Sequence, residues 1–261
     1  MIKLSSNIRF SPNISRGSVL FRKKLTEELN TKVFQSMLKL YEKKNDCGIE
    51  VVKSRYNSVL PERKNVQIVP LPLGDCDSYG GGVCIEESRE DFLSGYSIEV
   101  PTNKKKKLNV SLLSAFMHES THILDYLLNP KYVANYRQMC EKKIYDKEYF
   151  KIYERYFYNT DDMMHNDKEK MLMLAEEETR KALRRVQFDK KIVFLNYMKY
   201  SMEMEYHAYN QDILYAKLLQ KLGKPIDSEC LGDYNKYLAF PEKIEIINKL
   251  IREAIELQRV K

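Results

Sequence analysis

The sequence predicts an α+β fold that is mostly helical, with a short sheet confined to its first part. The chain has 261 residues, 43% of them hydrophobic, which is enough to bury a core without disulfide bonds. It contains only 9 Gly and 8 Pro, a composition that favours helices over an all-β architecture with many turns. No stretch rich in Gly, Ser or Pro divides the chain, so we expect a single domain over residues 1–261.

Residues 1–108 are expected to form one helix and the sheet. Apolar residues recur at helical spacing within residues 24–44, from Leu25 to Leu40, which predicts a helix there. After it, short segments rich in β-branched residues and bounded by Gly, Pro or polar residues predict four strands. These strands are expected at about residues 48–54, 65–72, 83–87 and 95–101.

Residues 109–261 are predicted to be helical. The segment 111–128 is strongly apolar, with Ser111 as the expected N-cap and Asn129-Pro130 as the stop signal. Further helices are expected in a tyrosine-rich stretch, in a long segment that ends before Gly223, and near the C-terminus. Their approximate ranges are 131–187, 190–221 and 232–258.

The first of these helices carries the motif His118-Glu119-Ser120-Thr121-His122. His118 and His122 are four residues apart, so their rings stand on one face of the helix, one turn apart. Two imidazoles placed in this way can bind one Zn²⁺, and Glu119 can accept a proton from a water at the same metal without being a ligand. With 4 His in 261 residues, such a motif arises by chance on the order of once in a few hundred chains. On a buried helix, two histidines and a glutamate require a polar or charged partner, such as a metal ion.

The segment FMHESTHILDYL resembles the active-site helix of the zincin superfamily of zinc metallopeptidases. The order of the predicted elements is also similar, with an N-terminal helix, a short sheet, an edge strand, the H-E-x-x-H helix and a later helix. The resemblance implies a zincin-like fold over about residues 24–221. It also implies a peptide or protein substrate that pairs in extended form with the edge strand GYSIEVP, residues 95–101.

The resemblance further implies a third zinc ligand on the long helix. Residues 125–130 lack the glycine and third histidine of the metzincin pattern, which indicates a gluzincin-like site with a later glutamate. Residues 203–211 resemble the E-x-E-A-x element of such proteins, with His207 in place of the second acidic residue. Glu205 shares a helical face with apolar residues, where a carboxylate requires a cation, whereas Glu203 shares its face with polar residues. Glu205 is therefore the predicted ligand and Glu203 the alternative.

Several further residues are weaker candidates for the site. Asp125, three residues after His122, could accept a hydrogen bond from that imidazole or could be a surface or capping residue. The loop between Cys76 and Cys84 could shape the rim of the cleft, and His165 is expected at the surface. Zincins often add a Tyr or His that donates a hydrogen bond to the developing oxyanion. The candidates for this role are Tyr197, Tyr200, Tyr206, His207 and Tyr209.

The composition indicates the compartment and the partners. The chain lacks both a secretory signal core and an apolar stretch of membrane-spanning length, which predicts a cytoplasmic protein without a membrane span. Its 5 Cys are scattered without a C-x-x-C pair, which predicts reduced thiols. The formal net charge is +7, but lysines are spread over the whole chain, so nucleic acid is not an expected partner.

The resulting hypothesis is a zinc-dependent endopeptidase that hydrolyses peptide bonds of a protein substrate. Its ligands would be His118, His122 and Glu205, and Glu119 would act as general base and then as proton donor. This type of chain is also typical of effector proteases delivered into another cell and of phage-encoded proteases. Two alternatives remain: a non-catalytic, basic helical binding protein derived from a zincin, and a zinc hydrolase that acts on a non-peptide bond.

Overall fold

In the part of the chain that the structure describes, the protein is mostly helical and carries two short two-stranded sheets, so the predicted α+β class is confirmed. The computed structural model describes residues 16–60, 66–72, 96–102, 105–158, 168–226 and 239–259. The strand expected at residues 83–87 lies outside the described residues. Within the described part, no helix is both long enough and apolar enough to span a membrane.

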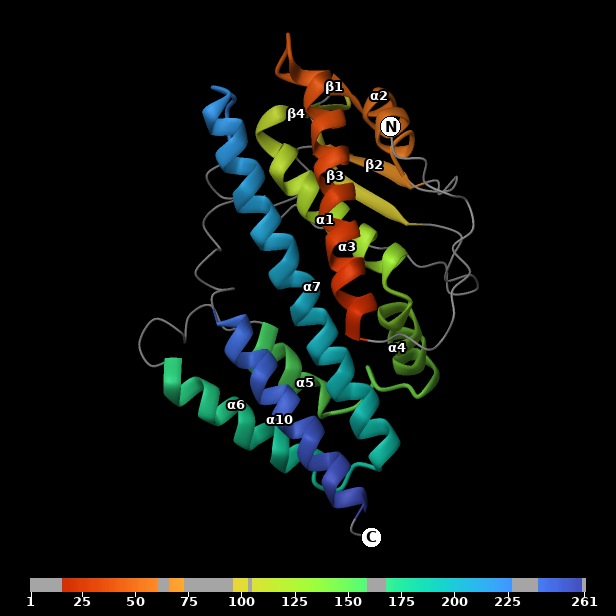
Figure 1. The fold of residues 1–261 in the computed structure, drawn as a ribbon, viewed down its shortest axis with the longest axis vertical. Helices are drawn as coiled ribbons and strands as arrows, with labels where there is room; N and C mark the ends of the chain where they lie inside the picture. The colour runs from red at the N-terminus through yellow and green to blue at the C-terminus, as the bar shows by residue number, and fades with distance from the viewer. Residues whose placement is uncertain are drawn as a thin grey trace.

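The N-terminal elements combine two helices with four strands. They are α1 (Arg16–Leu38), the 3-10 turn Lys39–Tyr41, β1 (Asp46–Gly48), α2 (Ile49–Asn57), β2 (Gln67–Pro72), β3 (Ser97–Thr102), β4 (Lys107–Asn109) and the 3-10 turn Val110–Leu112. Strand β1 pairs antiparallel with β4. Strands β2 and β3 are parallel, with Ile68 opposite Ile98. Both sheets lie at one end of the molecule, near α2 (Figure 1).

The remaining elements are helical. They are α3 (Leu113–Leu128), α4 (Pro130–Glu141), α5 (Phe150–Tyr153), the π-helix Glu154–Tyr158, α6 (Lys168–Leu183), α7 (Phe188–Lys221) and α10 (Phe240–Arg259). Helix α7 runs diagonally through the molecule and packs against α3, α4 and α10 (Figure 1). It ends just before Gly223, whose φ of 64° lies in the left-handed region that favours glycine after a helix.

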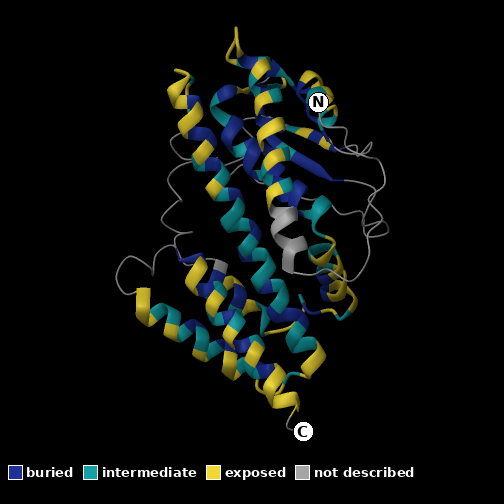
Figure 2. Cartoon of the chain, viewed as in Figure 1, coloured by how far each residue is buried: buried dark blue, intermediate teal, exposed yellow. Residues whose placement is uncertain are grey.

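Two hydrophobic cores share helix α7. The first is formed by α1, α2, the strands and α3, and it includes Tyr215 and Leu219 from the C-terminal end of α7. The second lies among α4, α5, α6, α10 and the N-terminal half of α7, which contributes Phe194 and Met202. Between these ends, α7 carries many half-buried positions (Figure 2). A polar cluster can therefore form in the middle of α7 without interrupting either core.

One predicted strand is wrong, because residues 49–57 form helix α2. The β-branched residues in this segment suggested a strand, but strand alternation would bury every second residue. In the structure Ile49, Val52 and Tyr56 are buried, whereas Val51 is 51% exposed. Spacings of three and four residues place the buried side chains on one helical face, and that face packs on the first core.

The other predicted elements agree in type with the structure where it describes them. The strands expected at 65–72 and 95–101 are β2 and β3, and the helix expected at 190–221 is α7. The stretch 131–187 is divided among α4, α5, the π-helix and α6. The prediction that Ser111 is the N-cap is wrong. The side chain of Asn109 caps the 3-10 turn Val110–Leu112, where it accepts a hydrogen bond of 2.9 Å from the Ser111 backbone amide.

Candidate metal centre

Helix α3 presents the H-E-x-x-H motif to helix α7. Its apolar side chains, such as Phe116 and Leu124, are buried, and the helix packs between α1 and α7. The buried hydroxyl of Thr121 donates a hydrogen bond of 2.8 Å to the backbone carbonyl of Met117, so this polar group is satisfied within α3. Glu119 is half-buried, whereas the two histidines are buried.

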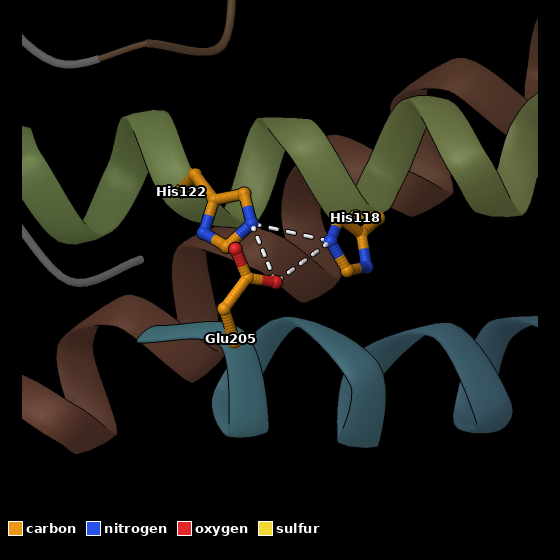
Figure 3. Close-up of side chains that lie close together, drawn as sticks. All are labelled: His118, His122 and Glu205. Atoms are coloured by element: carbon orange, nitrogen blue, oxygen red, sulfur yellow. Dashed lines mark hydrogen bonds and ion pairs between the residues drawn. The ribbon is translucent and has the colours of Figure 1, made fainter. Parts of the chain in front are cut away.

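Three potential ligand atoms converge between α3 and α7 (Figure 3). The Nε2 atoms of His118 and His122 are 3.1 Å apart. The Glu205 carboxylate oxygen Oε2 lies 3.6 Å from Nε2 of His118 and 3.5 Å from Nε2 of His122. The two rings come from successive turns of α3, and the carboxylate reaches them from the middle of α7 (Figure 3). This buried group could hold a metal ion.

The spacing of the three atoms fits a small divalent cation. Tetrahedral bonds of about 2.0–2.2 Å place any two ligand atoms about 3.3–3.6 Å apart. The separations of 3.5 and 3.6 Å lie in this range, and the 3.1 Å between the imidazole nitrogens lies just below it. Two imidazoles and one carboxylate are also a ligand set that zinc accepts.

Asp212 orients one of the two imidazoles and was not predicted from the sequence. Its carboxylate oxygen Oδ2 lies 2.8 Å from Nδ1 of His118, and both residues are buried. A proton on Nδ1 that is donated to Asp212 leaves the lone pair of His118 on Nε2, the atom that faces Glu205. Asp212 follows Glu205 by seven residues, two turns along the same face of α7, and this spacing was the signal in the sequence.

The charges of the site favour an additional positive charge between the two helices. Burial opposes ionisation of Glu205, but the adjacent His122 and His118 outweigh it and hold the pKa of this carboxyl well below its usual range. Burial likewise opposes protonation of the imidazoles. The carboxylates of Asp212 and Glu205 nevertheless raise the pKa of His118 well above its ordinary value, and Glu205 raises the pKa of His122. In the absence of a metal, protons therefore supply the positive charge that this site attracts.

Glu119 has an environment that suits proton transfer. Burial raises the pKa of its carboxyl above the ordinary value, against the opposing effect of the positive charge on His118 and His122. A carboxyl whose pKa is raised accepts a proton more readily and can return it in the same reaction. Glu119 does not belong to the group of three that could hold the metal.

Glu203, the alternative ligand, faces a different part of the structure. Its carboxylate lies 3.7 Å from the Lys199 ammonium, one turn earlier on α7, and 34% of its side chain is exposed. It also interacts with the hydroxyl of Tyr132 on α4. The Glu205 side chain, with 19% exposed, is the one that the structure brings to the two histidines.

Asp125 and His207 form a second carboxylate–imidazole pair across the α3–α7 interface. The Asp125 oxygen Oδ2 lies 2.9 Å from Nδ1 of His207. The hydrogen bond suggested between Asp125 and His122 is therefore wrong, and so is a surface position, because Asp125 is only 4% exposed. Nδ1 of His122 is buried and has no hydrogen-bond partner among the described residues.

The tyrosines proposed for the oxyanion are spread over different environments. Tyr209 lies against the predicted ligand His118, with ring centroids 4.4 Å apart. Tyr197 packs with Tyr145 in the second core, and Tyr200 packs with Tyr132. Tyr206 is half-buried against the second core. Two other candidates, the Cys76–Cys84 loop and His165, lie outside the described residues.

Comparison with known proteins gives no relative for this chain. No family model, no curated protein and no solved structure matches it.

Proposed function

We propose that this protein is a zinc-dependent metallopeptidase of the zincin type, an endopeptidase that acts on a protein substrate. The observation that supports it is the convergence of His118 Nε2, His122 Nε2 and Glu205 Oε2 between two helices. Two of these residues belong to the H-E-x-x-H motif, and the third comes from a helix about eighty positions later, as a gluzincin-like arrangement requires.

Zinc fits the chemistry of the three residues better than harder cations. Imidazole nitrogens suit zinc and other late transition metals, whereas magnesium and calcium prefer sites made only of oxygen atoms. When bound, zinc lowers the pKa of a coordinated water and polarises the carbonyl group of the substrate. The three protein ligands leave room for this, since catalytic zinc sites keep one position open.

The chain's own residues then divide the remaining work. Glu119 accepts the proton of the attacking water and delivers it to the leaving amine, so that the peptide bond breaks with one water consumed. Asp212 holds the imidazole of His118 in the tautomer and orientation that ligation requires. Because neither Glu119 nor Asp212 is a proposed ligand, their effects can be separated from the binding of zinc.

The substrate is proposed to bind as an extended chain along β3. Among the described residues β3 is paired with β2, and it also contacts β4. Extended peptides are commonly recognised by adding a strand to a sheet through their backbone amides and carbonyls. Strand β3 also contacts α3, the helix that carries the motif.

The first test combines metal analysis with a cleavage assay. Protein purified without chelator should contain about one zinc per chain and should cleave members of a broad peptide library. No stoichiometric metal would contradict the entire proposal. Zinc at one per chain without cleavage of any peptide would favour the two alternatives, a hydrolase of a non-peptide bond or a binding protein. Cleavage of small ester or amide substrates by the same preparation would distinguish between those two.

A further inference from the structure

The C-terminal part of helix α7 exposes a row of leucines. Leu214, Leu218 and Leu222 are 47%, 37% and 56% exposed (Figure 2). Steps of four residues place them on one side of the helix, whereas Tyr215 and Leu219 on another side are buried in the first core. The buried side already anchors this part of α7, so the exposed row is available for an apolar partner.

Lysines accompany this row. Lys217 and Lys221 are exposed on the same turns of α7 as the leucines. Three more exposed lysines lie in the segment that follows α1, namely Lys39, Lys43 and Lys44. The positive charge therefore comes from two segments that are far apart in the sequence.

These two segments are adjacent in the structure. The Nζ atom of Lys224, three residues after the end of α7, donates a hydrogen bond of 2.6 Å to the backbone carbonyl of Tyr41. The rings of Tyr215 and Phe34 stack with their centroids 4.2 Å apart, which joins α7 to α1. Both segments thus lie at the same end of the molecule (Figure 1). We use the name basic–leucine face for Leu214, Leu218, Leu222, Lys39, Lys43, Lys44, Lys217 and Lys221.

The positive charge of the basic–leucine face is not compensated by acidic neighbours in the sequence. Residues 39–44 and 214–224 contain six lysines together and a single acidic residue, Glu42. Within the described part of the chain, none of the five lysines of the face forms an ion pair, whereas Lys168 and Lys249 pair with glutamates on neighbouring helices. A partner that matches this face must therefore offer both negative charge and apolar material.

An anionic lipid surface meets both requirements. Leucine side chains can enter the boundary between headgroups and acyl chains, while the lysine ammonium groups stay beside the phosphates. Every cation of the face is a lysine, which acts as a mobile point charge towards a diffuse negative surface. Specific protein and nucleic-acid interfaces favour arginine instead, and the former are depleted in lysine. The composition of the face therefore favours lipid over a protein or nucleic-acid partner.

We propose that this protein binds peripherally to anionic lipid surfaces through the basic–leucine face. The inference does not depend on the proposed peptidase function. Glu205 precedes Leu218 by thirteen residues on α7, a rise of about 20 Å. Substitutions in the face should consequently leave the zinc content of the protein unchanged.

The first test measures binding of the full chain to lipid vesicles by co-sedimentation. Vesicles of phosphatidylcholine with about one-third phosphatidylserine should bind the protein at least about tenfold more tightly than vesicles of phosphatidylcholine alone. Lys217→Gln/Lys221→Gln should weaken this binding about 10–30-fold, because each lysine near an anionic surface contributes to affinity. Lys131→Gln/Lys147→Gln removes the same charge from exposed positions outside the face and should bind as the wild-type protein does.

A second pair of variants tests the leucines. Leu214→Gln/Leu222→Gln removes apolar surface but keeps residues that favour a helix, and it should weaken binding to the anionic vesicles about 10–100-fold. Met173→Gln/Leu257→Gln is the matched control, since these side chains are 67% and 65% exposed. They belong to α6 and α10 at the opposite end of the molecule (Figure 1), so their loss should not affect binding.

A fluorescent reporter can show directly whether the face enters the lipid. The chain contains no Trp, so Leu218→Trp provides a single tryptophan within the row of leucines. Its emission should shift to shorter wavelengths when anionic vesicles are added, because the indole ring leaves water. Met173→Trp should show no such shift.

Three outcomes would overturn this inference. The first is a wild-type protein that does not bind anionic vesicles. The second is equal weakening by Lys217→Gln/Lys221→Gln and by Lys131→Gln/Lys147→Gln, which would indicate an effect of net charge alone. The third is tight binding to duplex DNA that depends on the lysines and not on the leucines, which would assign the face to nucleic acid. None of these results bears on the metal analysis or the cleavage assay, so the two proposals can fail separately.

Discussion

His118 and Asp212 are joined across the α3–α7 interface by a hydrogen bond of 2.8 Å between Nδ1 and Oδ2. They are 94 residues apart in the chain, and both are buried. This contact determines which nitrogen of His118 is available to a metal, because the carboxylate keeps the proton on Nδ1 and leaves Nε2 as the ligand atom.

Weakening this contact should lower metal affinity without removing a ligand. Asp212→Asn preserves the size of the side chain but removes its charge, so we expect zinc affinity to fall about 10–100-fold. Competition with a chromophoric chelator measures this directly. Asp125→Asn is the matched control, since Asp125 pairs with His207, which is not a proposed ligand. An equal loss of affinity in both variants would show that general damage to the interface, and not the orientation of His118, is responsible.

Glu205 and Glu203 offer a matched test of the third ligand. Both are glutamates on α7, but only Glu205 lies within 3.6 Å of the Nε2 atoms of the two histidines. Glu205→Gln should lose most of the bound zinc, because a neutral amide is a much weaker ligand than a carboxylate. Glu203→Gln should keep about one zinc per chain by elemental analysis. The reverse pattern would transfer the ligand role to Glu203.

Glu119 should be essential for turnover but not for metal binding. Glu119→Gln retains the shape of the side chain but cannot accept a proton, so we expect turnover to fall about 10²–10⁴-fold. Its zinc content and its melting temperature should stay close to those of the wild-type protein. His118→Ala should be equally inactive but depleted of zinc. A Glu119→Gln protein with full biological effect, beside an inactive His118→Ala, would indicate a structural metal and a binding protein.

The motif and the third residue of the group could be predicted from the sequence, whereas the other contacts between α3 and α7 could not. The spacing of His118, Glu119 and His122 determines their arrangement on a helix, whatever surrounds it. The position of Glu205 next to the two histidines could be predicted because a carboxylate on an apolar helical face requires a cation. The partner of His118 depends on how α3 crosses α7, and no local pattern contains that angle. For the same reason the contact of Asp125 with His207 was missed, and a hydrogen bond with His122, its neighbour in the sequence, was one of the two roles suggested for it.

The fold shows the same division between local pattern and tertiary context. Helices α3 and α7 have long, periodic sequences and were predicted within a few residues. Helix α2 has only nine residues, and its Ile and Val content outweighed its periodicity when it was assigned as a strand. Burial of Ile49, Val52 and Tyr56 in the first core determines its conformation, and this depends on the completed fold.

The pKa shifts of the site predict that the metal-free protein loses stability as the pH rises, while the stabilisation added by zinc grows. Carboxylates raise the pKa of His118 and His122 in the folded state above their ordinary values. Their stabilising protonation is therefore complete below about pH 6.5, the ordinary value for histidine, and is lost as the pH rises through the higher folded values. With a chelator present, the melting temperature should consequently fall between about pH 6 and the alkaline range.

Zinc should offset this trend, because it replaces the protons of the same two imidazoles. Each proton displaced on binding makes zinc binding more favourable by about 1.4 kcal/mol per pH unit, so the increase in melting temperature caused by zinc should grow as the pH rises. Differential scanning fluorimetry with chelator and with excess zinc, at matched pH values, measures both trends. His118→Ala should flatten them, since it removes one titrating ligand. A zinc effect that is constant between pH 6 and 8 would mean that the metal binds elsewhere than at His118 and His122.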